Sequence, residues 1–177
     1  DLQVYFNPKD SIELETAIKL CEIRNETKKD HRWMIAYQNE MNEGNKTRIS
    51  ESGTFITLLP TSSRNNKNFY PFKHVINQIG SFLVGSNFPY SKIYPHEVIF
   101  NASNPLNKNA LSLNEIMKGY CYWPAFANFR ENTSGTLEKG KDATLVMFEK
   151  PMSFQNEKST NYANLVYIKG KQVYSIE

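Results

Sequence analysis

The sequence lacks any stretch that could serve as a membrane-spanning helix, because no apolar run approaches the roughly 20 residues that such a helix requires. Lysine and arginine are scattered and the net charge is only +3, so no basic run indicates a nucleic-acid-binding surface. The start, Asp-Leu-Gln, has neither the charged nor the apolar region of a targeting signal. We therefore expect a processed start or part of a longer chain, and the compartment stays undetermined.

Cysteine is also scarce, which excludes a dense disulfide framework. The two cysteines, Cys21 and Cys121, lie far apart and belong to no metal-binding or redox motif. We expect buried free thiols, and a disulfide between the two is the alternative. Four Asn-x-Ser/Thr sequons occur, but in a chain this rich in asparagine they say little about secretion.

The composition is otherwise that of a globular protein. A chain of 177 residues, 40% hydrophobic and 22% charged, is long enough for one domain with a substantial core. Short apolar runs alternate with helical patterns along its first half. The expected strands are Leu2–Phe6, Trp33–Tyr37, Phe55–Leu59 and Ser81–Gly85, and the expected helices are one capped by Ser11 that ends near Asn25, a short one near Gly44, and Phe72–Ile79.

This alternation favours an α/β fold with a parallel sheet, because parallel strands need helical crossovers and are apolar throughout. Two further helices are expected at Pro95–Ala102 and at Leu113–Phe129, the second preceded by Ser112. The end of the chain is β-rich. We expect a strand at Ala143–Phe148 and, within Asn164–Ser175, a hairpin that turns at Gly170-Lys171.

The stretch Ser81–Pro95 has the pattern of a buried strand that stops abruptly at a polar tip, Gly85-Ser86-Asn87. Catalytic groups in barrels and doubly wound sheets lie at the carboxyl ends of parallel strands. Ser86 could act as a nucleophile only with a base beside it, and the sequence places none, so hydrogen bonding within the turn is expected.

The run GTLEKGKDATLVMF, Gly135–Phe148, is the most specific motif in the chain. It resembles a run near the end of amidohydrolase superfamily proteins of the YtcJ-like branch (amidohydrolase family 3), which includes N-substituted formamide deformylases. Other stretches resemble the same family in the same order. These are QVYFNPKDS, HRWMIAYQN, GSNFPY with YP after it, LSLNEIMKGYCYWPAFANF and LVYIKGKQVY.

The resemblance implies that residues 1–130 are the second half of a TIM-like (β/α)8 barrel. Residues 131–177 would then be the carboxyl-terminal part of the small β-sandwich that such enzymes carry. The first half of the barrel, with the family's H-x-H pair and metal-bridging lysine, would lie outside this chain. The resemblance also implies that the amino-terminal half of the same protein, or a separate chain, completes the barrel.

Three positions correspond to the family's metal site, where members have two histidines and an aspartate that also serves as general base. This sequence has Tyr5, Tyr37 and Asn87 there. A phenol with a pKa near ~10 is a poor metal ligand, and an amide cannot act as a base. We therefore expect no cofactor and no confident catalytic residue.

The remaining residues of catalytic type have simpler expected roles. His31 lies at the amino end of its strand, His74 within a helix and His96 beyond the loop after the fourth strand, so we expect structural histidines. Lys9 and Asp10 could reach the mouth of a site, but helix capping or a solvated position is expected.

Two hypotheses about function follow. The first is a degenerate amidohydrolase-like protein, a pseudoenzyme that acts as a structural or interaction subunit of a larger assembly. The second is an active metal-dependent hydrolase of amide-like, non-peptide C–N bonds, with a divalent metal such as zinc held by ligands from the missing half. An unrelated α/β binding protein would require the match at Gly135–Phe148 to be accidental.

Overall fold

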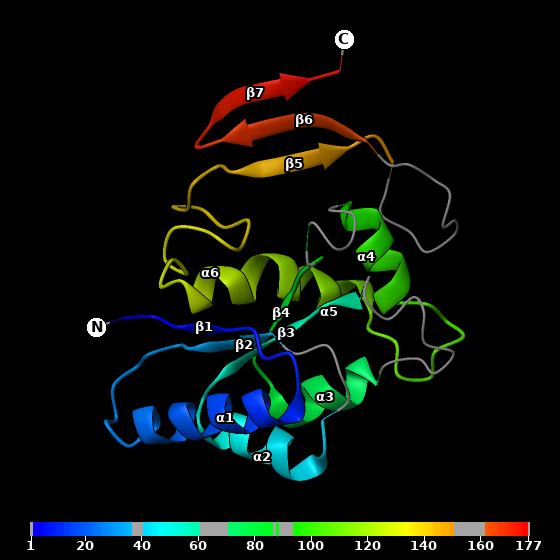
Figure 1. Ribbon diagram of the computed structural model, residues 1–177. Coiled ribbons are helices and arrows are strands. Elements are labelled where there is room, and N and C mark those ends of the chain that lie inside the picture. The colour runs from blue at the N-terminus through cyan, green and yellow to red at the C-terminus, as the bar shows by residue number, and fades with distance from the viewer. Residues whose placement is uncertain are drawn as a thin grey trace.

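The computed structural model describes residues 2–36, 41–60, 71–86, 88, 94–150 and 162–176. It contains a four-stranded sheet covered by helices and, at the carboxyl-terminal end, a separate three-stranded sheet (Figure 1). Among the described residues no helix is long and apolar enough to cross a membrane.

The first sheet is parallel, and its strands follow one another in the order of the chain. This confirms the α/β class with a parallel sheet. The strands are shorter than the apolar runs that predicted them. They are β1 (Tyr5–Phe6), β2 (Met34–Ala36), β3 (Phe55–Leu58) and β4 (Phe82–Val84).

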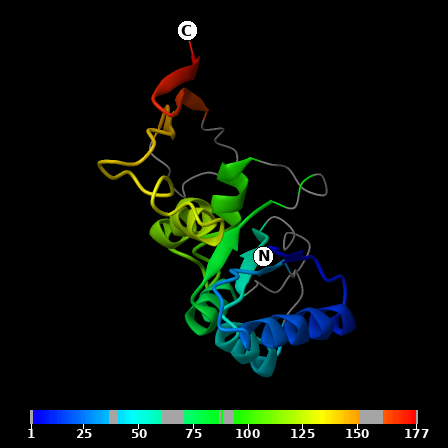
Figure 2. The same ribbon diagram turned by 90° about the vertical axis from the view of Figure 1, so that its left-hand side faces the viewer.

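Three helices follow the first three strands and cover one face of the sheet (Figure 1, and from the side in Figure 2). They are α1 (Ser11–Asn25), α2 (Glu43–Glu51) and α3 (Phe72–Ile79). Alternate strand residues such as Ile35, Ile56 and Val84 point to this face and pack against the helices in the main hydrophobic core. A strand–helix–strand order with all three connecting helices on one face is the arrangement of a piece of barrel wall.

The start of α1 corrects one sequence expectation. The capping residue is Asp10, not Ser11, because Oδ1 of Asp10 accepts the backbone N–H groups of Ile12 at 2.9 Å and Glu13 at 2.8 Å. Ser11 is instead the first residue of the helix. A carboxylate at this position also interacts favourably with the positive end of the helix dipole. The capping role expected for Asp10 is confirmed.

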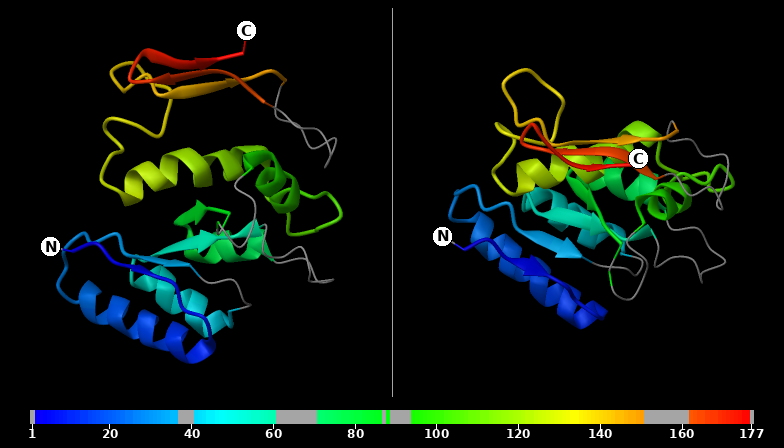
Figure 3. Two further views of the ribbon diagram at one scale, coloured as in Figure 1. Left: turned by 45° about the horizontal axis from the view of Figure 1, so that its top comes forward. Right: turned by 90° about the horizontal axis from the view of Figure 1, so that it is seen from above.

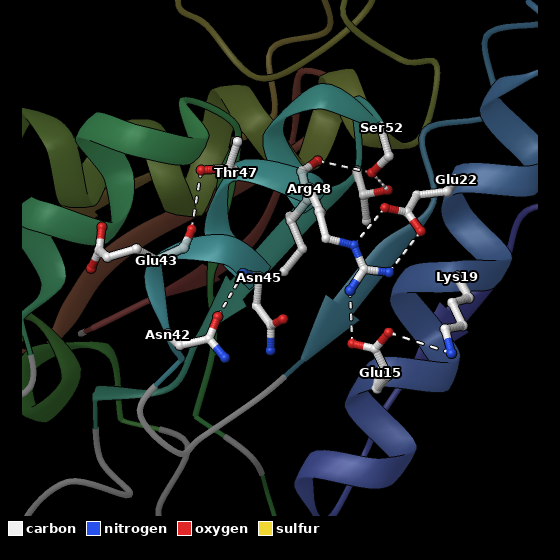
Figure 4. Close-up of polar contacts among 11 residues, drawn as sticks. Glu15, Lys19, Glu22, Asn42, Glu43, Asn45, Thr47, Arg48 and Ser52 are labelled. Atoms are coloured by element: carbon white, nitrogen blue, oxygen red, sulfur yellow. Dashed lines mark hydrogen bonds and ion pairs between the residues drawn. The ribbon is translucent and has the colours of Figure 1, made fainter.

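The helices α1 and α2 are joined by Arg48, which reaches across from α2 to two carboxylates on α1 (Figure 4). Its Nε lies 2.6 Å from Oε1 of Glu22 and its Nη1 lies 2.7 Å from Oε2 of Glu15. This fork of charge-assisted hydrogen bonds lowers the pKa of both carboxyls. The helix layer is therefore tied together by polar contacts outside the apolar core.

A further helix, α4 (Pro95–Ala102), is followed by one long helical run. That run consists of α5 (Leu113–Met117), the π-helical turn η2 (Lys118–Tyr122) and α6 (Trp123–Ala127). It begins with a capping box. Ser112 Oγ accepts the backbone N–H of Glu115, and the Glu115 side chain accepts the backbone N–H of Ser112. The helix expected at Leu113–Phe129 is confirmed, but it ends at Ala127, two residues earlier than expected.

The carboxyl-terminal part of this run packs against the opposite face of the sheet at the amino ends of the strands. Trp123 and Phe126 contact Phe55, with ring centroids 5.9 and 6.1 Å apart. Met34 and Leu83 belong to the same small cluster. The sheet therefore has helices α1–α3 on one face and the aromatic side chains of α6 on part of the other.

The second sheet is antiparallel and consists of β5 (Leu145–Phe148), β6 (Ala163–Ile168) and β7 (Lys171–Ser175), in that order. It extends from the rest of the chain, as Figure 3 shows. Successive residues point to opposite faces of a strand, yet Val146 and Met147 are both about half exposed, and so are Val173 and Tyr174. Within the described part of the chain, both faces of this sheet are poorly covered.

The cysteines agree with the expectation only in part. Both are free thiols, so the disulfide alternative is wrong. Cys21 is buried in the core between α1 and the sheet, and burial raises its pKa. Cys121, however, is exposed; it lies in the π-helical turn η2, two residues after Gly119, whose α-carbon packs against β4.

Candidate functional site

The carboxyl ends of the four parallel strands meet at one edge of the first sheet. The register pairs Ala36 with Thr57 and Leu58 with Val84, so the strand ends lie side by side. Gly85 continues the ladder, since its N–H donates to the carbonyl of Leu58 at 2.9 Å. A ligand would bind at this edge in a parallel sheet of this kind.

Of the three residues expected at this edge, one can be placed. Tyr5 lies on β1 and is 51% exposed, but it pairs with Met34, the first residue of β2, so the register puts it nearer the amino ends of the strands than the carboxyl ends. Tyr37 and Asn87 lie outside the described residues, so the expected proximity of the three side chains stays a prediction. Ser86 directly follows the end of the β4 ladder, at the polar tip that the sequence indicated.

The donor chemistry at these positions does not fit a divalent metal. Catalytic zinc sites use imidazole, thiolate or carboxylate ligands, and two phenols and an amide supply none of these. Elsewhere in the described ranges, no group of three or more His, Cys, Asp or Glu residues could hold a metal ion.

The face of β3 turned away from α1–α3 carries a buried hydroxyl. Thr57 is 6% exposed, and its Oγ1 has no hydrogen-bond partner among the described residues. A buried hydroxyl without a partner is unfavourable by about 1–3 kcal/mol. Thr57 therefore marks a position where a polar group from outside the described residues would be stabilising.

The three histidines lie apart from one another. His31 precedes β2 at the amino-end edge, as expected. His96 is in the first turn of α4, where its ring stacks on Tyr94 at 5.5 Å. His74 has a partner that the sequence did not indicate, because Nε2 lies 3.1 Å from Oε1 of Glu43 on the neighbouring helix. Contacts between helices leave no spacing signal in a sequence.

Glu43 is the centre of a polar cluster that sequence analysis missed. One oxygen contacts the amino group of Lys46 at 2.7 Å as well as His74, and the other accepts from Gln78. Hydrogen bonds from Lys46, Gln78 and His74, in that order, lower the pKa of Glu43 to about 2. Lys46 is almost completely buried, so its charge requires this carboxylate. The cluster fastens α2 to α3.

Arg32 joins the amino-end edge of the sheet to the end of α6. Its guanidinium carbon lies 3.8 Å from the ring centroid of Phe126 and 4.2 Å from that of Phe129. Its Nε lies 2.9 Å from Asp30, and its Nη1 lies 2.9 Å from Glu131 and also donates to the Phe126 carbonyl. These contacts are structural, since this edge is opposite to the one where chemistry is placed.

The parallel sheet, its helices on one face and the appended antiparallel sheet together match known structures. One is an amidohydrolase from Thermotoga maritima MSB8, with a TM-score of 0.74 and 16% identity over 99% of this chain. This is part of the amidohydrolase fold. An adenosine deaminase from Xanthomonas campestris with bound zinc has the same fold, with a TM-score of 0.72 and 16% identity over 99% of this chain.

The chain spans less than half of these amidohydrolase-fold structures. It covers 44% of the Thermotoga chain, 46% of the Xanthomonas chain and 32% of an uncharacterized metal-dependent hydrolase from Pyrococcus furiosus, which is 18% identical with a TM-score of 0.67 over 80% of this chain. No protein-family model and no curated protein matches the sequence. The similarity therefore establishes the fold, as the resemblance implied, and leaves the activity open.

Proposed function

We propose that this chain is the carboxyl-terminal half of an amidohydrolase-fold protein, of the YtcJ-like branch, that has lost its metal site. It serves as a structural or interaction subunit that a further polypeptide segment completes. That segment is the rest of the same protein or a separate chain. The proposal rests most directly on one observation, that nearly the whole chain matches less than half of the Thermotoga amidohydrolase.

The two edge strands of the first sheet, β1 and β4, support the need for a completing segment. β1 pairs only with β2, and β4 pairs only with β3, among the described strands. Four parallel strands with two open edges are half of an eight-stranded barrel. Four further strands, paired to one another and to both edges, would close the barrel and would cover the face that carries Thr57.

The donor set supports the loss of catalysis. The positions that correspond to the family's metal ligands and general base carry Tyr5, Tyr37 and Asn87. Neutral phenols bind zinc poorly, and an amide cannot accept the proton that water must lose. A single replacement would leave a weakened site, whereas three together remove both the ligands and the base.

An active metal-dependent hydrolase of amide-like C–N bonds is the second candidate. It is favoured by the folds that match, which include a metal-dependent hydrolase and a zinc-bound deaminase. In that case the ligands come from the segment that completes the barrel. The two candidates make opposite predictions about the metal content of the assembled protein.

The test is to purify the protein from its natural source through a carboxyl-terminal tag, identify what copurifies, and measure divalent metal per chain. We expect a polypeptide that supplies the missing barrel strands, and far less than one metal ion per chain after dialysis. Stoichiometric zinc in that assembly would overturn the pseudoenzyme proposal and support the hydrolase. Purification of a monomeric, cooperatively folded 177-residue chain would overturn the half-barrel proposal itself.

A further inference from the structure

Helix α1 is apolar on two sides. One side is buried in the main core beneath the helix. Elsewhere on the helix three large apolar residues are exposed, Ile12 by 77%, Leu20 by 43% and Ile23 by 61%. A surface helix normally has polar residues away from its core-facing side. We call these three residues the α1 stripe.

The neighbouring helices of the same layer have no such stripe. Among the exposed large hydrophobic residues of the described chain, none lies on α2 or α3. Ile49, the one aliphatic residue of α2, is buried, and so are all the apolar residues of α3. The α1 stripe is therefore specific to the helix beside the edge strand β1.

Leu20 lies on the flank of α1 that is turned away from α2. Glu22 contacts Arg48 of α2, and residues two positions apart on an α-helix point to nearly opposite sides. Because α1 contacts α2 and α2 contacts α3, α1 is the outermost of the three helices on this side. In the right-hand view of Figure 3, α1 and β1 lie along the same border of the molecule. The α1 stripe thus adjoins the open edge of β1.

The opposite border of the sheet is already covered on this face. Gly119 of η2 lies against Phe82 and Val84 of β4. Both strand residues belong to the main core, together with residues of α1–α3. The chain itself therefore extends the helix layer past β4, whereas at β1 the layer ends with the exposed α1 stripe.

We propose that the α1 stripe binds an amphipathic helix of the polypeptide segment that completes the barrel. This inference rests on the proposed function, and more than half of the Thermotoga amidohydrolase lies outside the match to this chain. A strand that extends the parallel sheet beyond β1 needs a right-handed crossover, which places its helix on the same face as α1–α3. That helix lies beside α1, with its apolar residues against Leu20.

A second copy of this chain fits the α1 stripe less well. A twofold axis perpendicular to the sheet brings the two α1 helices together but pairs β1 with its copy antiparallel. A twofold axis along the strands keeps the pairing parallel but puts the two α1 helices on opposite faces. Neither symmetry continues both the parallel sheet and the helix layer, and a strand–helix unit does both.

The test is photocrosslinking in the assembled protein. Benzoylphenylalanine replaces Leu20 or, in a separate control, Thr47, which is exposed on the middle helix α2. The peptides that become joined on illumination are identified by mass spectrometry. From position 20 we expect a crosslink to one segment of the completing polypeptide, in which apolar residues at helical spacing follow an apolar strand-like run. From position 47 we expect no crosslink to that segment.

A matched pair of substitutions measures how much the contact contributes. Leu20→Gln leaves helix propensity almost unchanged and removes apolar surface from the α1 stripe. It should lower the equilibrium constant for folding and assembly by about tenfold, because Leu20 is covered in the assembled protein. Thr47→Gln should change that constant by about twofold or less, as is usual for an exposed position. Denaturant unfolding of the assembled protein measures both.

Two kinds of failure are distinguishable. A crosslink from position 20 to α1 of a second copy would overturn the inference and indicate an interface between copies. No crosslink from position 20, or equal effects of the two glutamine variants, in an assembly that contains a completing polypeptide would overturn it and leave the half-barrel intact. A monomeric, cooperatively folded chain would overturn the proposed function and this inference together.

Discussion

A Cβ atom on Gly119 would lie 2.4 Å from Cγ2 of Val84, and 2.8 Å from the ring of Phe82. The π-helical turn of the long helical run is thus in direct contact with the edge strand β4. A glycine here has a packing role, because any side chain would move the helix away from the sheet.

Gly119→Ala should therefore destabilise the protein by about 1–3 kcal/mol, the usual cost of adding a methyl group to a packed core. The matched control is Gly44→Ala within α2, where the nearest atom to the new Cβ is Asn42 Oδ1 at 3.4 Å. That change should stabilise the protein by up to about 1 kcal/mol, because alanine favours a helix. Denaturant unfolding of the assembled protein measures both, and equal effects would contradict the close packing.

Replacing Arg32 with glutamine should destabilise the assembled protein by about 2 kcal/mol, because its side chain is only 10% exposed and lies against two aromatic rings. Hydrogen exchange should accelerate selectively in α6, since the Phe126 carbonyl loses its donor. The control is Arg130→Gln, which removes the same charge from an exposed residue just after α6. It should have no measurable effect. If exchange in α6 were unchanged, Arg32 would not be what fastens this helix.

The stability of the helix layer should depend on pH through Glu43. Its pKa in the folded protein is about 2, below the ordinary value of 4.5. A carboxyl with a lowered pKa contributes stability that is fully present above 4.5 and is lost as the pH falls through about 2. Thermal unfolding between pH 5 and 2 should show this loss, and Glu43→Gln should remove that part of the pH dependence. His74→Gln, which keeps a donor, should reduce it less.

Asn87→Asp alone should not create hydrolase activity, since one carboxylate cannot hold a catalytic metal that normally has three protein ligands. The informative comparison is with the triple variant Tyr5→His, Tyr37→His and Asn87→Asp in the completed barrel. If the positions are assigned correctly, the triple variant should bind zinc and the single variant should not. Metal-dependent turnover in the single variant would mean that most of a site was already present.

Expressed alone, residues 1–177 should be aggregated or molten. Both edges of the first sheet are apolar, and unpaired backbone groups in buried positions cost roughly 1–3 kcal/mol each. A marginally stable domain cannot compensate for several of them. Co-expression with the completing segment should give a soluble species with a cooperative unfolding transition in circular dichroism. A cooperative transition without that segment would count against the half-barrel.

The sequence predicted the elements well where local signals decide them. The helices Phe72–Ile79 and Pro95–Ala102 have the expected bounds, and the box at Ser112 starts its helix as expected. Strand lengths were less accurate. Leu2–Phe6 is an apolar run, but only Tyr5 and Phe6 pair with β2, because pairing depends on the neighbouring strand and not on apolarity.

The site could be predicted only in part, for a related reason. The resemblance supplied Tyr5, Tyr37 and Asn87 as metal-site positions, whereas local patterns identified only the polar tip Gly85-Ser86-Asn87. The contacts of Glu43 with His74 and of Arg32 with Phe126 join residues far apart in the chain. Such pairs depend on how helices dock, and no spacing rule in a single sequence encodes them.

The exposed faces of the second sheet bear on the cellular abundance of this protein. Its apolar residues are half exposed on both faces, as Val146 and Met147 show. Surfaces of this kind are recognised by chaperones and proteases when they stay uncovered. If a separate chain completes the barrel, as proposed above, the abundance of this chain should follow that of the completing chain, and depletion of the completing chain should shorten the lifetime of this protein without any change in its synthesis.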